Sequence, residues 1–480
     1  MKNSFILFFF LIGISPTLKA QNFNDFIAYL NALPSTERQA KVDSFMNTLD
    51  QTPVVETDYV SFVFQSTETN IAVPGDFNGW NPNAASLSKV SGTDLWYRTY
   101  AFDNAARLEY KFFEDGNWYL DIDNPYYAFG GFGANSELRM PDYVPPIEVV
   151  TDFDVPSGVL LDTSYYSYNL SNNRQIKVYT PPGYESSSAS YSTVLVHDGL
   201  EYVDIAEMPT ILDNLISAGL IEPVIALFVP PVNRTPEYAN EDQADFTGFI
   251  VEEIYPWLDQ RFRTKTTAAD RAVIGSSLGG NISLWLGLTE PETFGNIGAF
   301  SPYIEEDIRQ LMNNGVVYAG KVYMNHGTYD HLDLIHESVD FAVPVMVDKG
   351  YDHIYDEYPE GHSYYFWRAY LDEALIYFFP GAVSDVSEGF ASDLKVNLEV
   401  YPNPVSDSAW VEYSLSKQVE SQLILFRSNG HLHQLLTYGN YNAGTYKFAI
   451  ERTESDLKGT YVLVLFVNGE SVASKKVVFK

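Results

Sequence analysis

Residues 271–281 read Arg-Ala-Val-Ile-Gly-Ser-Ser-Leu-Gly-Gly-Asn, a short apolar run followed by the pattern Gly275-x-Ser277-x-Gly279. Residues 272–274 are typical of a buried strand, and the apolar spacing that follows the pattern predicts a helix. A serine on a tight strand-to-helix turn needs glycines two residues away on both sides, because larger side chains would collide with the neighbouring backbone. The stretch therefore predicts a nucleophile elbow with Ser277 exposed at the edge of a sheet.

Two side chains that complete a catalytic triad follow, each after a strand-like run. Asp330 comes after the run 321–325, and His362 comes after the run 353–358. The chain order Ser277, Asp330, His362 is that of α/β-hydrolases. In this arrangement the serine attacks an ester carbonyl, the histidine takes and returns the proton, and the aspartate fixes the imidazole tautomer.

The acid has alternatives that the sequence leaves open. Asp330 can instead cap the helix that follows it, which leaves Asp333 as the acid or the site as a Ser–His dyad. A different grouping takes His326, Asp330, His331 and Asp333 as a metal site. Their spacing fits no zinc pattern, so we expect neither a metal nor a cofactor.

Three motifs, at residues 275–280, 361–368 and 234–238, resemble those of the enterochelin-esterase-like and feruloyl-esterase group of α/β-hydrolases. The resemblance covers about half of the chain. It implies a nucleophile at Ser277 and a base at His362, and the acid is less regular in this group.

The same resemblance implies further site residues. It places oxyanion-hole amides at Leu278 and in the loop at Gly199 and Leu200, where two aimed donors are worth roughly a few kcal/mol each. It also places Arg234, Glu237 and Tyr238 at the substrate-facing edge. These last residues either contact substrate, or Arg234 and Glu237 pair with each other to brace their loop.

Composition limits the location and the partners. Residues 1–20 combine a basic start, an apolar run and a small-residue end, which predicts a secretory signal peptide, and no later stretch is long enough to span a bilayer. The chain has no cysteine, which excludes disulfides and thiolate metal sites. Its net charge of −34 opposes binding to nucleic acid but is compatible with a neutral polysaccharide.

The residues before the hydrolase indicate a separate module. A helical lead over residues 21–56 precedes a region, 57–142, whose apolar period switches to two. This region predicts an antiparallel β-sandwich, and its motifs resemble immunoglobulin-like glycogen-binding modules. The resemblance implies a sugar platform at positions in turns and strands of the sandwich: Trp80, Lys111, Trp118 and Asn135. The alternative is that the turn carrying Trp80 is only structural.

The remaining chain divides at two linkers. A proline-punctuated linker over 143–156 leads into 157–380, where alternating strands and helices predict an α/β-hydrolase with a mostly parallel sheet and helices on both faces. After a second linker over 381–396, residues 397–480 read as a C-terminal β-sandwich. This part resembles the sorting domain of the type IX secretion system of Bacteroidota, which implies export by that machinery. An ordinary accessory sandwich is the alternative.

These observations favour a secreted or cell-surface serine carboxylester hydrolase that removes ferulate or acetate esters from plant polysaccharide. Hydrolysis of a siderophore trilactone is the first alternative, although an anionic catecholate fits poorly with the acidic chain. A carbohydrate-binding protein with an inactive hydrolase fold is the second.

Overall fold

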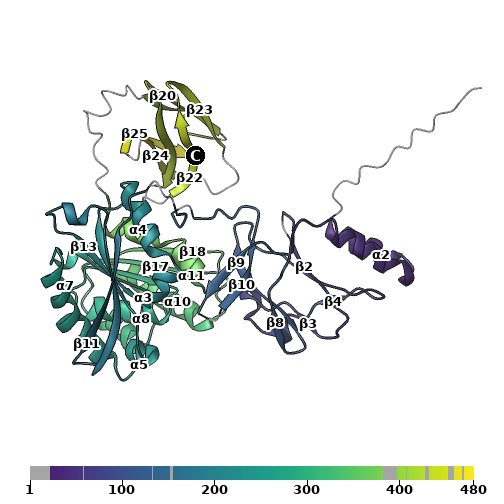
Figure 1. Ribbon diagram of the computed structural model, residues 1–480, viewed down its shortest axis with the longest axis horizontal. Coiled ribbons are helices and arrows are strands. Elements are labelled where there is room, and N and C mark those ends of the chain that lie inside the picture. Colours follow the sequence, from purple (N-terminus) through teal and green to yellow (C-terminus); the bar gives the residue numbers. More distant parts are fainter. Residues whose placement is uncertain are drawn as a thin grey trace, which may run out of the picture.

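The computed structural model describes residues 22–57, 59–131, 133–146, 148–151, 155–381, 397–406, 408–427, 432–451, 459–467 and 470–479. The expected signal peptide and nearly all of the expected linker 381–396 lie outside the described residues. Along the chain lie an N-terminal module (residues 23–139), a hydrolase domain (159–378) and a C-terminal module (397–479) (Figure 1).

The N-terminal module begins with two helices, α1 (Phe23–Ala32) and α2 (Ser35–Met46), separated at Pro34. Antiparallel strands in three small sheets follow. The sheets are β1 (Val54–Val55), β2 (Val60–Gln65), β5 (Leu95–Tyr100) and β4 (Ser88–Lys89); β6 (Arg107–Tyr110), β10 (Gly133–Arg139) and β9 (Tyr127–Gly130); and β3 (Ile71–Ala72), β7 (Phe112–Glu114) and β8 (Asn117–Tyr119).

The sheets of this module share one core. Phe62 of β2, Leu108 of β6 and Leu138 of β10 belong to a single buried apolar cluster. The next residue of β2, Val63, points to the other face and packs with α1 and α2. Alternate residues of a strand face opposite sides, so the helices explain why β2 is buried on both faces. An immunoglobulin-like topology stays a prediction.

The hydrolase domain contains an eight-stranded mixed sheet. Six strands are parallel, and β11 and β12 add antiparallel pairs at one edge. The order is β11 (Val159–Ser167), β12 (Asn172–Thr180), β14 (Val224–Val229), β13 (Ser192–His197), β15 (Arg271–Ser276), β16 (Asn296–Phe300), β17 (Lys321–Gly327) and β18 (Asp352–Tyr358).

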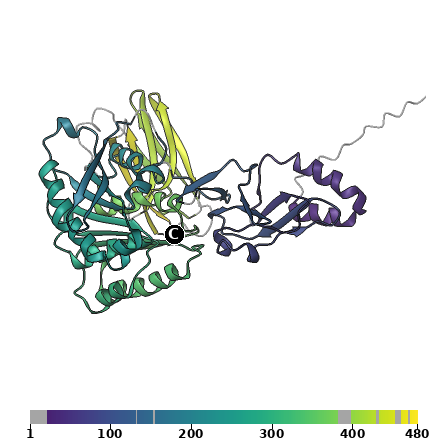
Figure 2. The ribbon, with the colours of Figure 1, turned by 60° about the horizontal axis from the view of Figure 1, so that its bottom comes forward.

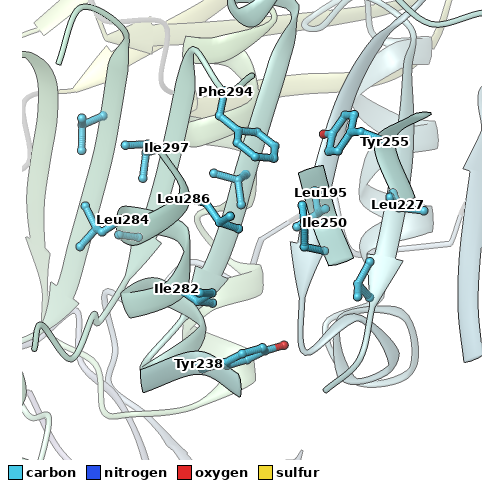
Figure 3. Close-up of a cluster of buried hydrophobic side chains, with 14 of the residues drawn as sticks. Leu195, Leu227, Tyr238, Ile250, Tyr255, Ile282, Leu284, Leu286, Phe294 and Ile297 are labelled. Atoms are coloured by element: carbon cyan, nitrogen blue, oxygen red, sulfur yellow. The ribbon is translucent and has the colours of Figure 1, made fainter. Parts of the chain in front are cut away.

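The central strands of this sheet carry apolar residues at successive positions, so both faces of the sheet are apolar. Helices cover both faces and bury these residues. Val194 belongs to the core of one face and Leu195 to the core of the other. One face carries α3 (Gly199–Asp204), α4 (Met208–Ser217), α11 (Tyr364–Arg368) and α12 (Leu371–Phe378). The other carries α5 (Arg234–Ala239), α6 (Gln243–Gly248), α7 (Tyr255–Arg261), α8 (Leu278–Thr289), α9 (Glu306–Asn314) and α10 (Asp333–Lys349). Figure 3 shows part of the core on this face, with residues of α5, α7 and α8 among those labelled.

The C-terminal module consists of two antiparallel sheets around one core that includes Val411, Leu423 and Leu463. One sheet is β19 (Asn397–Tyr401), β20 (Ser408–Leu415) and β23 (Gly444–Glu451); the other is β22 (Leu432–Tyr441), β21 (Val419–Arg427), β24 (Gly459–Val467) and β25 (Glu470–Phe479).

The N-terminal module meets the hydrolase domain at β9, which packs against α11. Figures 1 and 2 show this end of the module against the hydrolase, with α2 at the opposite end. Within the described ranges, no helix has the length and apolar character needed to cross a membrane.

Candidate active site

Ser277 lies between the end of β15 and the start of α8, in a backbone conformation that is rare for a residue with a side chain. Its φ is 57° and its ψ is −119°. Three backbone hydrogen bonds hold it there: its N–H donates to the Phe300 carbonyl at 2.9 Å, and its carbonyl accepts from the N–H groups of Tyr303 at 3.1 Å and Asn281 at 3.2 Å. A strained strand-to-helix turn of this kind projects the serine hydroxyl away from the sheet.

The predicted backbone collision is confirmed for Gly275 but not for Gly279, where an added Cβ would lie 3.1 Å from the Asp198 side chain. A Cβ added to Gly275 would lie 2.5 Å from the backbone of Gly279, and one added to Gly280 would lie 2.9 Å from Pro302. Real Cβ atoms do not approach so closely, so the local sequence is what allows α8 to pack directly on the end of β15.

His362 and Asp330 come from the loops after β18 and β17. The Nδ1 atom of His362 lies 2.6 Å from Oδ2 of Asp330, whose other oxygen accepts from the Leu332 N–H at 3.0 Å. Burial opposes ionisation of Asp330, but the hydrogen bond and charge of His362 outweigh it and hold the pKa of the carboxyl below its usual value. Asp333, the alternative acid, is the first residue of α10.

Ser277 and His362 line the same pocket, which has a volume of about 910 Å³. Because Nδ1 of His362 is engaged by Asp330, Nε2 is the ring nitrogen left to exchange a proton. No hydrogen bond joins Ser277 to His362 in the described part of the chain; such contacts commonly tighten only with substrate bound.

The alternative grouping as a metal site lacks a suitable geometry. Among the described residues, no three His, Asp or Glu side chains are placed to hold a metal ion. His326 instead contacts His336, with Nε2 3.2 Å from Nδ1, and Tyr355, whose hydroxyl is 3.0 Å from the Nδ1 of His326.

The three residues expected to supply oxyanion-hole amides lie at the starts of helices. Leu278 is the first residue of α8, and Gly199 and Leu200 open α3, so their N–H groups have no partner within their helices. A Cβ on Gly199 would lie 2.4 Å from the backbone of Phe228, so only glycine fits there. Leu200 lines the pocket together with Ser277.

The residues expected at the substrate edge separate in the structure. Arg234 lines the pocket, whereas Glu237 and Tyr238 are buried and do not contribute to its wall. The pairing of Arg234 with Glu237, one of the two expected alternatives, is wrong. Arg234 donates to both oxygens of Asp198 at 2.8 Å, and Glu237 pairs with Arg174 at 2.6 Å.

Tyr238 and Glu237 support the neighbouring loops. The Tyr238 hydroxyl accepts from the N–H of Asp198 at 3.0 Å, directly before Gly199. Glu237 accepts from the N–H groups of Val232 and Asn233, which precede Arg234. Both residues therefore support the site indirectly, because they hold the backbone of loops whose side chains line the pocket.

The four residues expected to form a sugar platform lie on the wall of the Ser277 pocket. Trp80, Lys111, Trp118 and Asn135 all line it, together with Ser277 and His362. The two indole rings are neighbours, with centroids 6.4 Å apart. The N-terminal module therefore forms one side of the pocket whose other side carries the serine.

The charged lining of the pocket is not basic. Asp76, Glu109, Asp198 and Glu201 face Lys111 and Arg234. Asp198 is neutralised by Arg234, and burial, reinforced by Glu109, raises the pKa of Asp76 to about 7. The pocket thus offers no positive field for an anionic ligand.

Sequence reasoning missed that the two walls belong to one pocket. It also missed Asp76, Glu109, Tyr364 and Trp367 as lining residues. The residues of the two walls are far apart in the chain, and no local sequence pattern indicates that they lie close together in the fold. The only signal was the aromatic character of Trp80 and Trp118.

The sheet, the elbow and the Asp–His pair define the class of the central domain. Residues 167–378 match the family described as "Putative esterase". Fold and family match together support an esterase-like α/β-hydrolase and an ester hydrolase.

Two relatives are similar in sequence. The uncharacterized protein YjcH of Bacillus subtilis is 24% identical over 235 residues, which are 46% of this chain and 97% of that protein. An endo-1,4-beta-xylanase/feruloyl esterase of Xylanibacter ruminicola is 23% identical over 240 residues, 46% of this chain but 31% of that protein.

Among solved structures, the enterobactin esterase FES of Shigella flexneri has a similar fold, with a TM-score of 0.59 at 19% identity. The match covers 70% of this chain and 97% of that one, more than the segment 167–378 alone, so the shared fold extends beyond the hydrolase sheet.

Proposed function

We propose that this protein is a serine carboxylester hydrolase that removes feruloyl or acetyl esters from polysaccharide. The observation that carries the proposal is the pocket itself: a strained serine elbow and an Asp–His pair open into one cavity large enough for a glycan-linked ester. Pockets for small ligands measure roughly 300–1,000 Å³, so this one is at the upper end.

The proposed mechanism uses three side chains. Ser277 Oγ attacks the ester carbonyl while His362 Nε2 accepts its proton, and the buried Asp330 carboxylate stabilises the imidazolium through Nδ1. The alcohol leaves with the proton from His362, and an acyl ester remains on Ser277. Water then attacks this ester while His362 accepts its proton; the bond to Ser277 Oγ breaks, His362 returns the proton to Oγ, and the carboxylic acid leaves.

The amides of Leu278 and of Gly199 or Leu200 are the proposed donors to the oxyanion. Donors fixed at helix starts need no reorganisation as charge develops on the carbonyl oxygen. Tyr238 and the Arg234–Asp198 pair hold the loop that presents Gly199.

The charge of the pocket favours a neutral substrate. Ferulate and acetate esters of sugars carry no charge before cleavage, and the indoles of Trp80 and Trp118 offer faces for an aromatic acyl group or a pyranose ring. The relative from Xylanibacter ruminicola, named as an endo-1,4-beta-xylanase/feruloyl esterase, agrees with this choice.

A siderophore trilactone is the second candidate, and the size of the pocket and its two-module wall favour it. The structural similarity to an enterobactin esterase is a similarity of fold, and this fold is compatible with the siderophore candidate. Glu109 is paired with Arg107, so Glu201 and the partly ionised Asp76 are the wall carboxyls that oppose a ligand bearing several negative charges.

An activity panel separates the candidates. We expect turnover of methyl ferulate and acetylated xylan, weak or no turnover of a catecholate trilactone, and no turnover of any substrate by Ser277→Ala. A preference for the trilactone would reverse the ranking. Binding of xylan without turnover of any ester would favour a carbohydrate-binding protein with an inactive hydrolase fold.

Export by a type IX secretion machinery to the cell surface or medium is part of the same proposal. It is supported by the motifs of residues 397–480, and the C-terminal module has its own core. Removal of residues 398–480 should leave hydrolysis of a soluble ester intact and retain the protein in the periplasm. Normal export of the truncated chain would refute this part of the proposal.

A further inference from the structure

The loop that carries His362 is held by a residue of the N-terminal module. Arg107 of β6 is fully buried. Its N–H donates to the Pro359 carbonyl at 3.1 Å. Its guanidinium donates through Nη1 to Glu360 at 3.2 Å and to the Ser363 hydroxyl at 3.3 Å. The contacts of this one arginine therefore fall on both sides of His362 in the sequence.

The loop that carries Asp330 is joined to the same module. The Tyr329 hydroxyl accepts from the N–H of Asp103 at 3.1 Å, and the ring of Tyr329 packs edge-on against Phe102. The N–H of Tyr329 donates to the Glu360 carbonyl at 3.0 Å, which links the two catalytic loops to each other.

Close packing adds to these hydrogen bonds next to the histidine. A Cβ added to Gly361 would lie 2.2 Å from the carboxyl carbon of Asp76 in the module. Asp76 is itself fixed, because it accepts from the Glu109 N–H at 2.7 Å and from the Trp80 indole at 3.0 Å. The backbone next to His362 thus rests on a rigid part of the other module.

The charges explain why Arg107 is firmly placed. Its Nη2 atom lies 2.9 Å from Glu109 and 3.1 Å from Glu137, both in the module, while Nη1 reaches Glu360 in the hydrolase domain. All four side chains are buried. A buried guanidinium shared by several carboxylates has one favourable position, since any displacement leaves a buried charge unpaired.

We propose that Arg107 is a positioning residue of the hydrolase, which holds the His362 loop at Ser277 through Glu360 and Ser363. In this account the N-terminal module is needed for turnover of every ester, including those too small to touch Trp80 or Trp118. The inference rests on the proposed function. A displacement of about 1 Å at a catalytic group can lower a rate roughly 100-fold, so the contacts of Arg107 act on kcat.

The test compares two substitutions in the same charge cluster. Glu360→Gln weakens the link from Arg107 to the His362 loop. Glu137→Gln is the matched control. The Glu137 side chain pairs with Arg107 and Arg139, both in the module, and within the described residues it forms no ion pair with the hydrolase domain. With 4-nitrophenyl acetate at about pH 9, above the raised pKa of Glu360 of about 8, Glu360→Gln should lower kcat roughly tenfold to 100-fold at an unchanged KM, and Glu137→Gln should keep kcat within about twofold.

A second variant tests the same proposal if Glu360→Gln does not fold. Gly361→Ala leaves every charge in place but forces the His362 loop away from Asp76, and it should give the same loss of kcat. Thermal unfolding of each variant checks that the fold is retained.

The outcomes separate this inference from the function on which it rests. Loss of kcat in Glu360→Gln or Gly361→Ala, with kcat kept in Glu137→Gln, supports positioning. Equal losses in all three variants, or wild-type kcat in the two loop variants, would overturn it while the hydrolase remains. A wild-type protein without Ser277-dependent turnover would overturn the proposed function and this inference together.

Discussion

The two walls of the pocket are built in different ways. The hydrolase wall follows from the chain order of parallel strands: Ser277 directly follows β15, and the loops after β17 and β18 carry Asp330 and His362. The wall of the N-terminal module instead consists of turn and strand residues brought in by contact between two modules. In the proposals made above, the chemistry is local to one sheet edge, whereas substrate choice and loop placement depend on the second module.

The largest effect is expected in the hydrolase wall. Ser277→Ala and His362→Ala should each lower kcat on the order of 10⁴–10⁶-fold, because nucleophile and base act as a unit. Release of 4-nitrophenol from its acetate ester measures this, with thermal unfolding as the control for folding. Turnover near the wild-type rate in either variant would contradict the serine mechanism.

A smaller loss is expected at the acid. Asp330→Asn should lower kcat roughly 10²–10⁴-fold, since the imidazole loses its tautomer and its charge partner. Asp333→Asn, three residues away at the start of α10, is the matched control and should stay within about twofold. If Asp333→Asn were the more damaging change, the acid assigned here would be wrong.

The module wall should alter binding more than chemistry. Trp80→Ala combined with Trp118→Ala removes two ring contacts worth roughly 0.5–1.5 kcal/mol each, so KM for a feruloylated oligosaccharide should rise about tenfold or more. Turnover of 4-nitrophenyl acetate at saturation should be unchanged in Trp118→Ala alone, because Trp80 also holds Asp76 beside the His362 loop.

Methyl ferulate sharpens this comparison of the walls. Because both tryptophans line the Ser277 pocket, the double variant should also bind methyl ferulate more weakly. An unchanged KM for methyl ferulate, with weaker retention in xylan-containing gels, would instead indicate a sugar platform independent of the active site.

The smallest expected effect is on the pH dependence of the free energy of unfolding. Burial raises the pKa of Glu360 to about 8, partly offset by Arg107, and burial with Glu109 raises that of Asp76 to about 7. A raised carboxyl pKa means that the folded state prefers the protonated form. The stability that these groups contribute is therefore complete below their ordinary pKa values and is lost as pH rises through about 7–8.

Glu360→Gln should flatten this dependence, since the amide cannot ionise. The groups facing Glu360 are Arg107, Glu109, Glu137, Tyr143 and Tyr370, and they remain in the variant. Thermal unfolding between about pH 6 and 9 should show the wild type losing more stability than Glu360→Gln. Parallel curves for the two proteins would contradict the assignment.

Much of the hydrolase could be predicted from its sequence because its signals are local. The backbone contact that requires Gly275 is with Gly279, four residues away, and strand ends fix which loops share an edge of the sheet. Arg107 could not be found in this way, because its partner Glu360 is 253 residues away in the chain. The pairing of Arg234 with Asp198 likewise depends on how two loops fold together.

The most direct test of the central claim is covalent labelling of the nucleophile. A fluorophosphonate reacts with a serine that a neighbouring base activates, and mass spectrometry of the intact and digested protein locates the adduct. The account predicts one adduct per chain, on Ser277, absent from Ser277→Ala and formed much more slowly in His362→Ala. An unlabelled wild-type protein, or an adduct on another residue, would contradict it.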